Sequence, residues 1–175
     1  TFVVERALLG ADLRWSKAIN IALHVINGVL LAWFILLLLR GSGYSRSLAV
    51  ALLAAGLWLV SPLWVSTVLY AVQRMAMLAC TFMLLTLIAY LHWRAAYVRG
   101  QSGVWRLLVV GGCAVLAVFA KENGIVVLPV LLLLELLWFG CRRSGVVDRR
   151  LLAIALGLLA LGTLLVVSVF LVVPE

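Results

Sequence analysis

Charged residues are scarce in this chain. They make up 11% of its 175 residues, whereas hydrophobic residues make up 67%. A soluble domain carries roughly 25% charged residues, and a soluble core of this length does not need so much apolar surface. The shortage of charge excludes an ordinary soluble domain and indicates a membrane protein.

Acidic residues are the rarest charged residues, with 6 Asp and Glu against 14 Lys and Arg, for a formal net charge of +8. The chain has no basic stripe with interleaved aromatic residues, which is the usual sign of nucleic-acid binding. Most of its arginines instead lie in short polar segments between hydrophobic stretches. The positive charge therefore does not indicate a nucleic-acid partner.

Cysteine is also sparse. Cys80, Cys113 and Cys141 are far apart, odd in number and form no Cys-x-x-Cys pair. We interpret them as small apolar residues that fill space within the spans, and we expect neither a metal nor another cofactor.

Hydrophobic stretches fill most of the chain and lack the period-2 alternation of barrel strands. At roughly 1.5 Å per residue, most of them are long enough to cross a hydrocarbon core of about 30 Å as helices. We therefore predict an all-α fold, a polytopic transmembrane helical bundle forming a single domain over residues 1–175 with about six spans. The predicted spans are Ala18–Leu39, Ser47–Leu63, Met75–Trp93, Val104–Ala120, Gly124–Gly140 and Leu151–Val173.

The basic residues divide unequally when the loops are assigned alternately to two sides. Nine arginines fall on one side and five basic residues on the other, so the positive-inside rule places the first group in the cytoplasm. Both termini are then external. The first group is Arg40, Arg46, Arg94, Arg99, Arg106, Arg142, Arg143, Arg149 and Arg150; the second is Arg6, Arg14, Lys17, Arg74 and Lys121.

The chain begins with Thr1-Phe2-Val3-Val4, which is not an initiator sequence, and no signal peptide follows. An external amino terminus in a polytopic protein normally needs a preceding span or a cleaved signal. We therefore expect the chain to be a fragment, or a processed or incompletely identified version of something longer.

Three polar residues share one face of the first predicted span. Asn20, His24 and Asn27 are spaced i, i+4 and i+7, which stacks them on a helix. Such a face indicates either interhelical hydrogen bonds or the polar wall of a substrate cleft open to the external side. His24 has no second ligand at metal-binding spacing, so a metal role is not expected.

The second predicted span meets Pro62, a helix stop signal, and Val65–Val72 is expected to lie along the interface. This segment leads to Gln73 and Arg74 at the outer mouth of the third span. Arg74 either extends to the lipid headgroups or holds a phosphate, because its guanidinium offers two charge-assisted hydrogen bonds.

Lys121-Glu122-Asn123 form the external turn between the fourth and fifth spans. One interpretation is a tight turn in which Asn123 caps the fifth span; the other is a functional charged pair. Farther along, Glu135 falls inside the fifth span, about one turn from its inner end. We expect it to reach the interface or to pair with an arginine there.

A series of motifs resembles the TPR-linked bacterial membrane glycosyltransferases of the GT-C fold, relatives of the transmembrane-and-TPR O-mannosyltransferases. The resemblance covers roughly residues 7–140. It rests on Leu9-Gly10-Ala11-Asp12 with Asn20 and Leu23-His24, on Ser61-Pro62-Leu63-Trp64 followed by Tyr70-Ala71-Val72-Gln73-Arg74-Met75, and on Ala120-Lys121-Glu122-Asn123-Gly124.

The resemblance implies a sugar transferase in the bacterial inner membrane that uses a polyprenyl-phosphate-linked donor on the external face. Its leaving group would be a lipid phosphate, which fixed cations stabilise as charge develops. The resemblance assigns this phosphate to Arg74 and Lys121. The residues implied in the substrate cleft are Asn20, His24, Gln73 and Glu122.

The chain departs from the family in one respect. Family members carry an acidic catalytic residue in a first external loop, after a first span, and neither that span nor most of that loop is present. Asp12 matches the later Gly-x-Asp position, so no catalytic residue is assigned and activity is expected to need further sequence. The alternative is a non-catalytic structural subunit that packs with other membrane subunits. A transporter is less favoured, because paired intramembrane charges and an inverted repeat are lacking.

Overall fold

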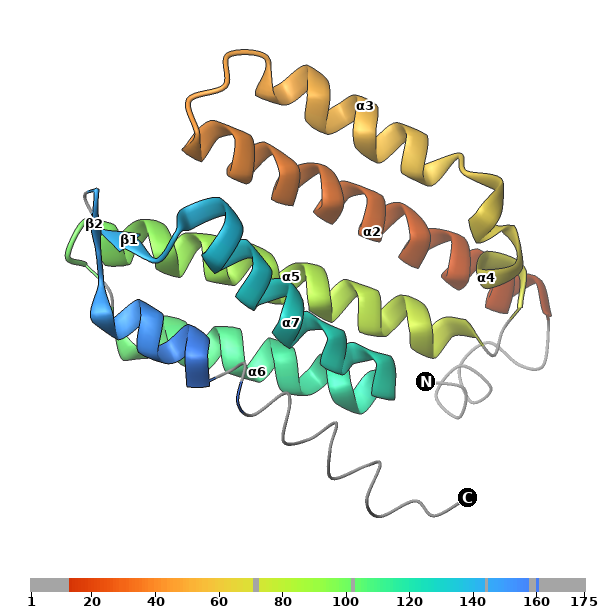
Figure 1. Ribbon diagram of the computed structural model, residues 1–175. Helices are drawn as coiled ribbons and strands as arrows, with labels where there is room; N and C mark the ends of the chain where they lie inside the picture. Colours follow the sequence, from red (N-terminus) through yellow and green to blue (C-terminus); the bar gives the residue numbers. More distant parts are fainter. Residues whose placement is uncertain (1–12, 71–72, 102, 144, 158–159, 161–175) are drawn as a thin grey trace.

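The computed structural model describes residues 13–70, 73–101, 103–143, 145–157 and 160. These residues form helices and one short hairpin (Figure 1). The first half contains α2 (Leu13–Gly41), α3 (Ser47–Leu59), the 3-10 turn η1 (Pro62–Trp64), α4 (Val65–Leu69) and α5 (Arg74–Val98). The second half contains α6 (Val104–Ala120), the 3-10 turn η3 (Glu122–Val126), α7 (Val127–Leu133), the π-helical turn η4 (Leu134–Phe139), β1 (Arg142–Arg143), β2 (Val146–Val147) and a helix over residues 149–157.

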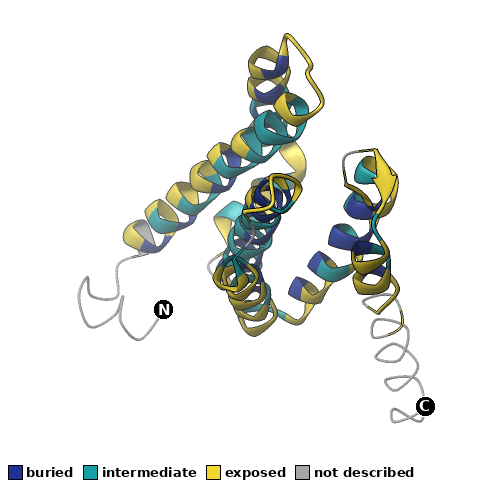
Figure 2. Ribbon diagram, turned by 90° about the vertical axis from the view of Figure 1, so that its left-hand side faces the viewer, coloured by how far each residue is buried: buried dark blue, intermediate teal, exposed yellow. Residues whose placement is uncertain are grey.

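Helix α5 lies at the centre of the bundle. It packs against α2 on one side and against α6 and α7 on the other, while α3 packs against α2 (Figure 1). Most of the buried residues of the described chain belong to α5 and to the faces of its neighbours (Figure 2). The all-α fold predicted from the sequence is confirmed.

Among the described residues, three helices are long and apolar enough to cross a membrane: Trp15–Gly41, Arg74–Val98 and Glu122–Phe139. A fourth candidate is the pair Ser47–Leu59 and Pro62–Leu69, which is bent by 47° at Pro62. The predicted break at this proline is confirmed, since its ring cannot continue the helix hydrogen bonds.

Helix α6 has the predicted bounds Val104–Ala120, but its 17 residues span only about 26 Å, less than a hydrocarbon core. Of the sixth predicted span, Leu151–Val173, most lies outside the described residues. The number of six spans therefore stays a prediction. What the described chain contains is three to four candidate spans.

The outer surface of the bundle is strongly apolar. Leu53, Leu57, Leu108 and Phe119 are 63–83% exposed although each belongs to a helix. Exposed apolar side chains of this density are compatible with an integral membrane protein whose helices face lipid.

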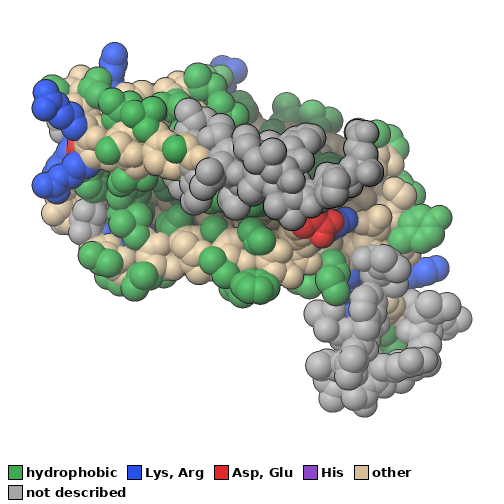
Figure 3. Space-filling model, turned by 60° about the horizontal axis from the view of Figure 1, so that its bottom comes forward, with side chains coloured by type: hydrophobic (Ala, Val, Ile, Leu, Met, Phe, Trp, Pro, Cys, Tyr) green, Lys and Arg blue, Asp and Glu red, His purple; other side chains and the backbone are tan. Residues whose placement is uncertain are grey.

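The two ends of the bundle differ in charge. We call the end that holds the α2–α3 loop, the α5–α6 loop and the hairpin the arginine-rich end (Figure 1). Lys and Arg side chains gather there (Figure 3). The other end, where α2 and α5 begin and α6 ends, is called the Lys121 end. The fold thus keeps apart the described members of the two groups of basic residues that the sequence divides, while Arg6 lies outside the described residues. The side of the membrane that each end faces stays a prediction.

The segment after η4 was expected to be a polar loop, and it instead forms an antiparallel hairpin. Arg142 pairs with Val147 and Arg143 with Val146. Gly145 has a φ of +87° in the turn, a conformation that glycine adopts without steric cost.

Candidate functional site

Arg74 is the first residue of α5 and is only 2% exposed. Its Nε donates to Oδ1 of Asn20 at 3.0 Å. Its Nη2 donates to Oγ of Ser16 at 2.7 Å and to the backbone oxygen of Ser16 at 3.2 Å. The guanidinium therefore joins the beginning of α5 to the beginning of α2.

Asn20 continues this network and is fully buried. Its Nδ2 donates to the carbonyl oxygens of Val68 and Tyr70, at 3.1 and 3.2 Å, in and just after α4. One asparagine side chain thus bridges three segments, because its amide both accepts from α5 and donates to α4.

The other two polar residues of this α2 face also contact neighbouring helices. Asn27 donates to the carbonyl of Met77 at 3.0 Å and accepts from Oγ1 of Thr81 at 2.7 Å. The His24 ring donates from Nε2 to the carbonyl of Leu59 at 3.1 Å and stacks on Trp58, with ring centroids 4.8 Å apart. Asn20, His24 and Asn27 therefore form hydrogen bonds to neighbouring segments, which was one of the two interpretations left open by the sequence.

Gln73 and the Lys121 turn lie at the same end of the bundle as Arg74. Gln73 is half-buried immediately before α5, and its backbone N–H donates to the Tyr70 carbonyl at 3.0 Å. Lys121 directly follows α6 and is half-buried, whereas Glu122 is exposed at the beginning of η3. η3 packs against both α6 and α5.

Of the two interpretations of this turn that the sequence left open, the one in which Asn123 caps the fifth span is wrong. Lys121 occupies the capping position, without a side-chain hydrogen bond, and Asn123 lies inside the 3-10 turn. The chain turns this early because the Gly124 N–H donates to the Lys121 carbonyl at 2.8 Å. Gly124 is buried against the backbone of α6, where it leaves no room for a side chain.

A second buried polar cluster lies toward the arginine-rich end. Glu135, 4% exposed, pairs with Arg94, 3% exposed. Arg94 donates from Nε to Oε2 at 3.0 Å and from Nη2 to Oε1 at 3.1 Å, and Tyr90 donates its hydroxyl to Oε2. Arg94 Nη2 also donates to the carbonyl of Arg142. The expectation that Glu135 pairs with an arginine is confirmed. The expectation that paired intramembrane charges are lacking is wrong, because Arg94 and Glu135 belong to two candidate membrane spans.

Tyr90 and Arg94 were not expected from the sequence to belong to this cluster. The available signal was their spacing of four residues, which places both on one face of α5. Glu135 sits in the π-helical turn η4, an irregularity often found at functional sites.

The hairpin is fastened to α5 by Tyr97. The Tyr97 hydroxyl donates to Oδ2 of Asp148 at 2.7 Å, and the Arg143 guanidinium lies 4.9 Å from the centre of the Tyr97 ring. Oδ1 of Asp148 accepts the N–H of Arg150 at 2.8 Å, so Asp148 caps the helix over 149–157. The hydrogen bond from Tyr97, followed by that from the Arg150 N–H, lowers the pKa of the Asp148 carboxyl.

We expect Asp148→Ala to increase amide hydrogen exchange across residues 149–157, because both the cap and the Tyr97 contact are lost. Asp148→Asn should retain more of the protection, since its side-chain oxygen still accepts the cap bond. The folded-state pKa is lowered, so the contribution of Asp148 is present at neutral pH and lost as the pH falls through that lowered value. Exchange measured by mass spectrometry at constant pH checks this; equal exchange in both variants contradicts it.

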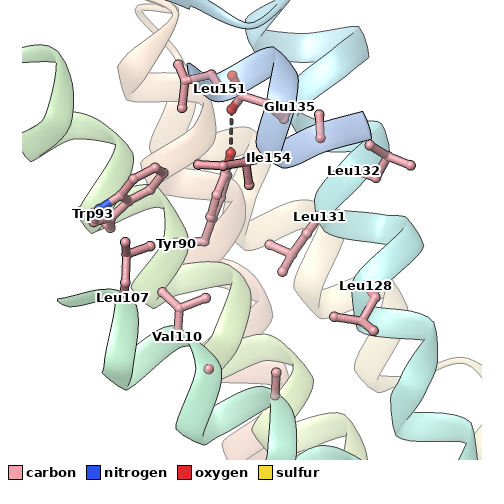
Figure 4. Close-up of a pocket in the computed structure, with 13 residues that line it drawn as sticks. Tyr90, Trp93, Leu107, Val110, Leu128, Leu131, Leu132, Glu135, Leu151 and Ile154 are labelled. Carbon is pink, nitrogen blue, oxygen red and sulfur yellow. Dashed lines mark hydrogen bonds between the residues drawn. The ribbon is translucent and has the colours of Figure 1, made fainter. Parts of the chain in front are cut away.

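A pocket of about 230 Å³ lies among α5, α6, α7 and the helix over 149–157 (Figure 4). Tyr90 and Glu135 close it on one side, joined by their hydrogen bond. The rest of its wall is apolar. The lining residues drawn in Figure 4 include Trp93, Leu107, Val110, Leu128, Leu131, Leu132, Leu151 and Ile154.

No protein-family model, curated protein or solved structure matches this chain. Within the described residues, no group of His, Cys, Asp and Glu side chains has the geometry to hold a metal ion. The fold therefore defines the class of this protein: an all-α bundle with apolar helices compatible with integration into a membrane. A function has to be inferred from the residues of the candidate site.

Proposed function

We propose that this chain is the membrane core of a GT-C-type glycosyltransferase that uses a polyprenyl-phosphate sugar donor. The observation that carries the proposal is the meeting of three distant segments at the Lys121 end. Asn20 and Arg74, 54 residues apart, are joined at 3.0 Å, and η3, which follows Lys121, packs against α5. The described parts of the segments that resemble the family's motifs, around Asn20, Arg74 and Lys121, are thus neighbours in space, while Leu9-Gly10-Ala11-Asp12 and Ala71-Val72 lie outside the described residues.

The Lys121 end would face the external side of a bacterial inner membrane. The excess of arginine at the other end supports this orientation, because cytoplasmic loops are enriched in basic residues. It would also place both termini outside and the three motif segments on the side where a lipid-linked donor is used.

We propose different roles for Lys121 and Arg74, because Lys121 is more exposed than Arg74. Lys121 is half-buried, and its ammonium would bind the lipid phosphate and stabilise it as the glycosidic bond breaks. Arg74, held by Asn20 and Ser16, would supply a second fixed positive charge at the same end. Gln73 and Glu122 lie beside them and would contact sugar or diphosphate oxygens, with His24 and Asn20 supporting the wall behind.

Lys121→Ala tests this proposal. We expect the variant to lose polyprenyl-phosphate-dependent transfer by on the order of 100-fold, because one fixed donor to the developing charge is removed. Transfer is assayed in membranes that contain the chain together with any sequence it needs. Lys17→Ala is the matched control, since Lys17 is an exposed lysine at the same end and should leave transfer unchanged.

A non-catalytic structural subunit is the second candidate, and one observation favours it. Arg74, Asn20 and Asn27 are all almost completely buried and bonded to other helices, as packing residues are. Binding of polyprenyl phosphate and of the matching polyprenol to the purified chain separates the two candidates. A preference for the phosphate that Lys121→Ala abolishes supports the transferase; equal binding of both lipids supports the structural subunit.

A further inference from the structure

The wall of the pocket in Figure 4 is almost entirely apolar, which suits a hydrocarbon chain. Its two polar lining residues are Tyr90 and Glu135, which bond to each other, and Arg94 neutralises the charge of Glu135. The remaining lining side chains are apolar. A polar or charged ligand would find no partner on the described wall, whereas an acyl chain would be matched along it.

The pocket is reached from the surface of the bundle. Gly111 lines it and is exposed, and a Cβ added there would meet no other atom within 4 Å. Along α7 and the first residues of η4 the lining extends from Leu128 to Glu135, which corresponds to about 10 Å of helix. This length suits a section of one lipid chain entering between α6 and the helix over 149–157.

Basic residues flank the pocket where it approaches the arginine-rich end. Arg149 and Arg150 are exposed and directly precede Leu151, a lining residue. Guanidinium groups beside a lipid-accessible apolar pocket complement a phosphate in the headgroup layer.

We propose that this pocket is a binding site for an anionic phospholipid, with one acyl chain beside Gly111 and the phosphate on Arg149 and Arg150. The site lies at the opposite end from Lys121 and does not depend on the proposed transferase activity. Its occupant is a membrane lipid, selected by the charge of its headgroup.

Native mass spectrometry of the delipidated chain, titrated with phosphatidylglycerol or with phosphatidylcholine of the same acyl chains, tests the proposal. We expect phosphatidylglycerol to bind more tightly. The double variant Arg149→Gln/Arg150→Gln should weaken its binding about thirtyfold, from roughly fivefold per basic residue. The matched control is Arg40→Gln/Arg46→Gln, in the last turn of α2 and just before α3 at the same end, which should change little.

Two adjacent glycines test the acyl-chain part of the site. Gly111→Leu places a side chain in the pocket and should weaken phosphatidylglycerol binding about tenfold. Gly112→Leu is the control, because Gly112 is equally exposed with open space around its Cβ position, and does not belong to the lining. Circular dichroism should show the same helix content in both variants.

Three results would overturn the proposal. Equal binding of phosphatidylglycerol and phosphatidylcholine would show that the headgroup charge is not recognised. Equal weakening by the two pairs of arginine substitutions would show a general charge effect. Equal phosphatidylglycerol binding by Gly111→Leu and Gly112→Leu would show that the acyl chain does not occupy the pocket. A phosphatidylglycerol with a photoreactive acyl chain gives a test without substitutions: crosslinks should map to α6 and residues 149–157, and crosslinks confined to α2 and α3 would contradict the site.

Discussion

Replacing Glu135 by glutamine is expected to lower the free energy of unfolding by about 3–5 kcal/mol, because Arg94 then remains buried without its counter-charge. Arg94 is 3% exposed and donates hydrogen bonds to both oxygens of the carboxylate. Glutamine keeps the shape of the side chain but not the charge. Reversible unfolding in bicelles or detergent micelles measures the difference.

Glu122→Gln is the matched control for this substitution. Glu122 is exposed at the beginning of η3, so its loss of charge should change stability by no more than about 0.5 kcal/mol. If the two variants lose equal stability, the buried pair does not have the importance that its geometry indicates.

The double variant Arg94→Met/Glu135→Leu separates the pair from the packing around it. Replacing a buried ion pair by apolar residues of similar volume is often neutral, so the double variant should recover most of what Glu135→Gln loses. Tyr90 and the Arg142 carbonyl each lose a partner in this variant, which should keep recovery incomplete.

Gly124→Ala is expected to cost about 3 kcal/mol of stability, near the upper end for overpacking. An added Cβ would lie 2.1 Å from the carbonyl oxygen of Ala117 and 2.7 Å from the amide nitrogen of Val118. These are backbone atoms of α6, which no side-chain rotation can move away. The turn over Glu122–Val126 would have to shift off α6, and with it the beginning of the Glu122–Phe139 candidate span.

Gly112→Ala provides the comparison for Gly124→Ala. A Cβ at Gly112, in the middle of α6, meets nothing within 4 Å, and alanine favours a helix over glycine by up to about 1 kcal/mol. Gly112→Ala should therefore be neutral or stabilising in the same unfolding experiment. An equal loss in both variants would show that the close approach of Gly124 to α6 is not the cause.

The helices could be predicted because long hydrophobic stretches without period-2 alternation favour helices over barrel strands. The bounds of α6 and the break at Pro62 followed from local sequence alone. The hairpin after η4 did not, because its strands are only two residues long and carry no alternation that a sequence pattern can reveal.

The site was harder to predict than the fold because its contacts join residues far apart in the chain. The sequence singled out Asn20 and Arg74 separately, and only the packing of α5 on α2 and α4 shows that one bonds the other. Arg94 illustrates the same limit: it was counted as a loop charge, yet it lies buried on α5 against Glu135. Which arginine pairs with a buried glutamate depends on how the helices are rotated and on how deep each residue lies in the bundle. The composition of the chain does not determine either of these.

The direction of synthesis also determines the order in which the two buried arginines of α5 can form their contacts. The partners of Arg74 on α2 precede it in the chain, so they have left the ribosome when α5 emerges. Glu135 follows Arg94 by 41 residues, which at 5–20 residues per second is a delay of about 2–8 s. During that interval Arg94 must reach the headgroups by extending its side chain, since a charge inside the bilayer is costly. The central helix therefore becomes fixed at its Lys121 end first, and its other end becomes fixed only after the ribosome has made α7 and η4.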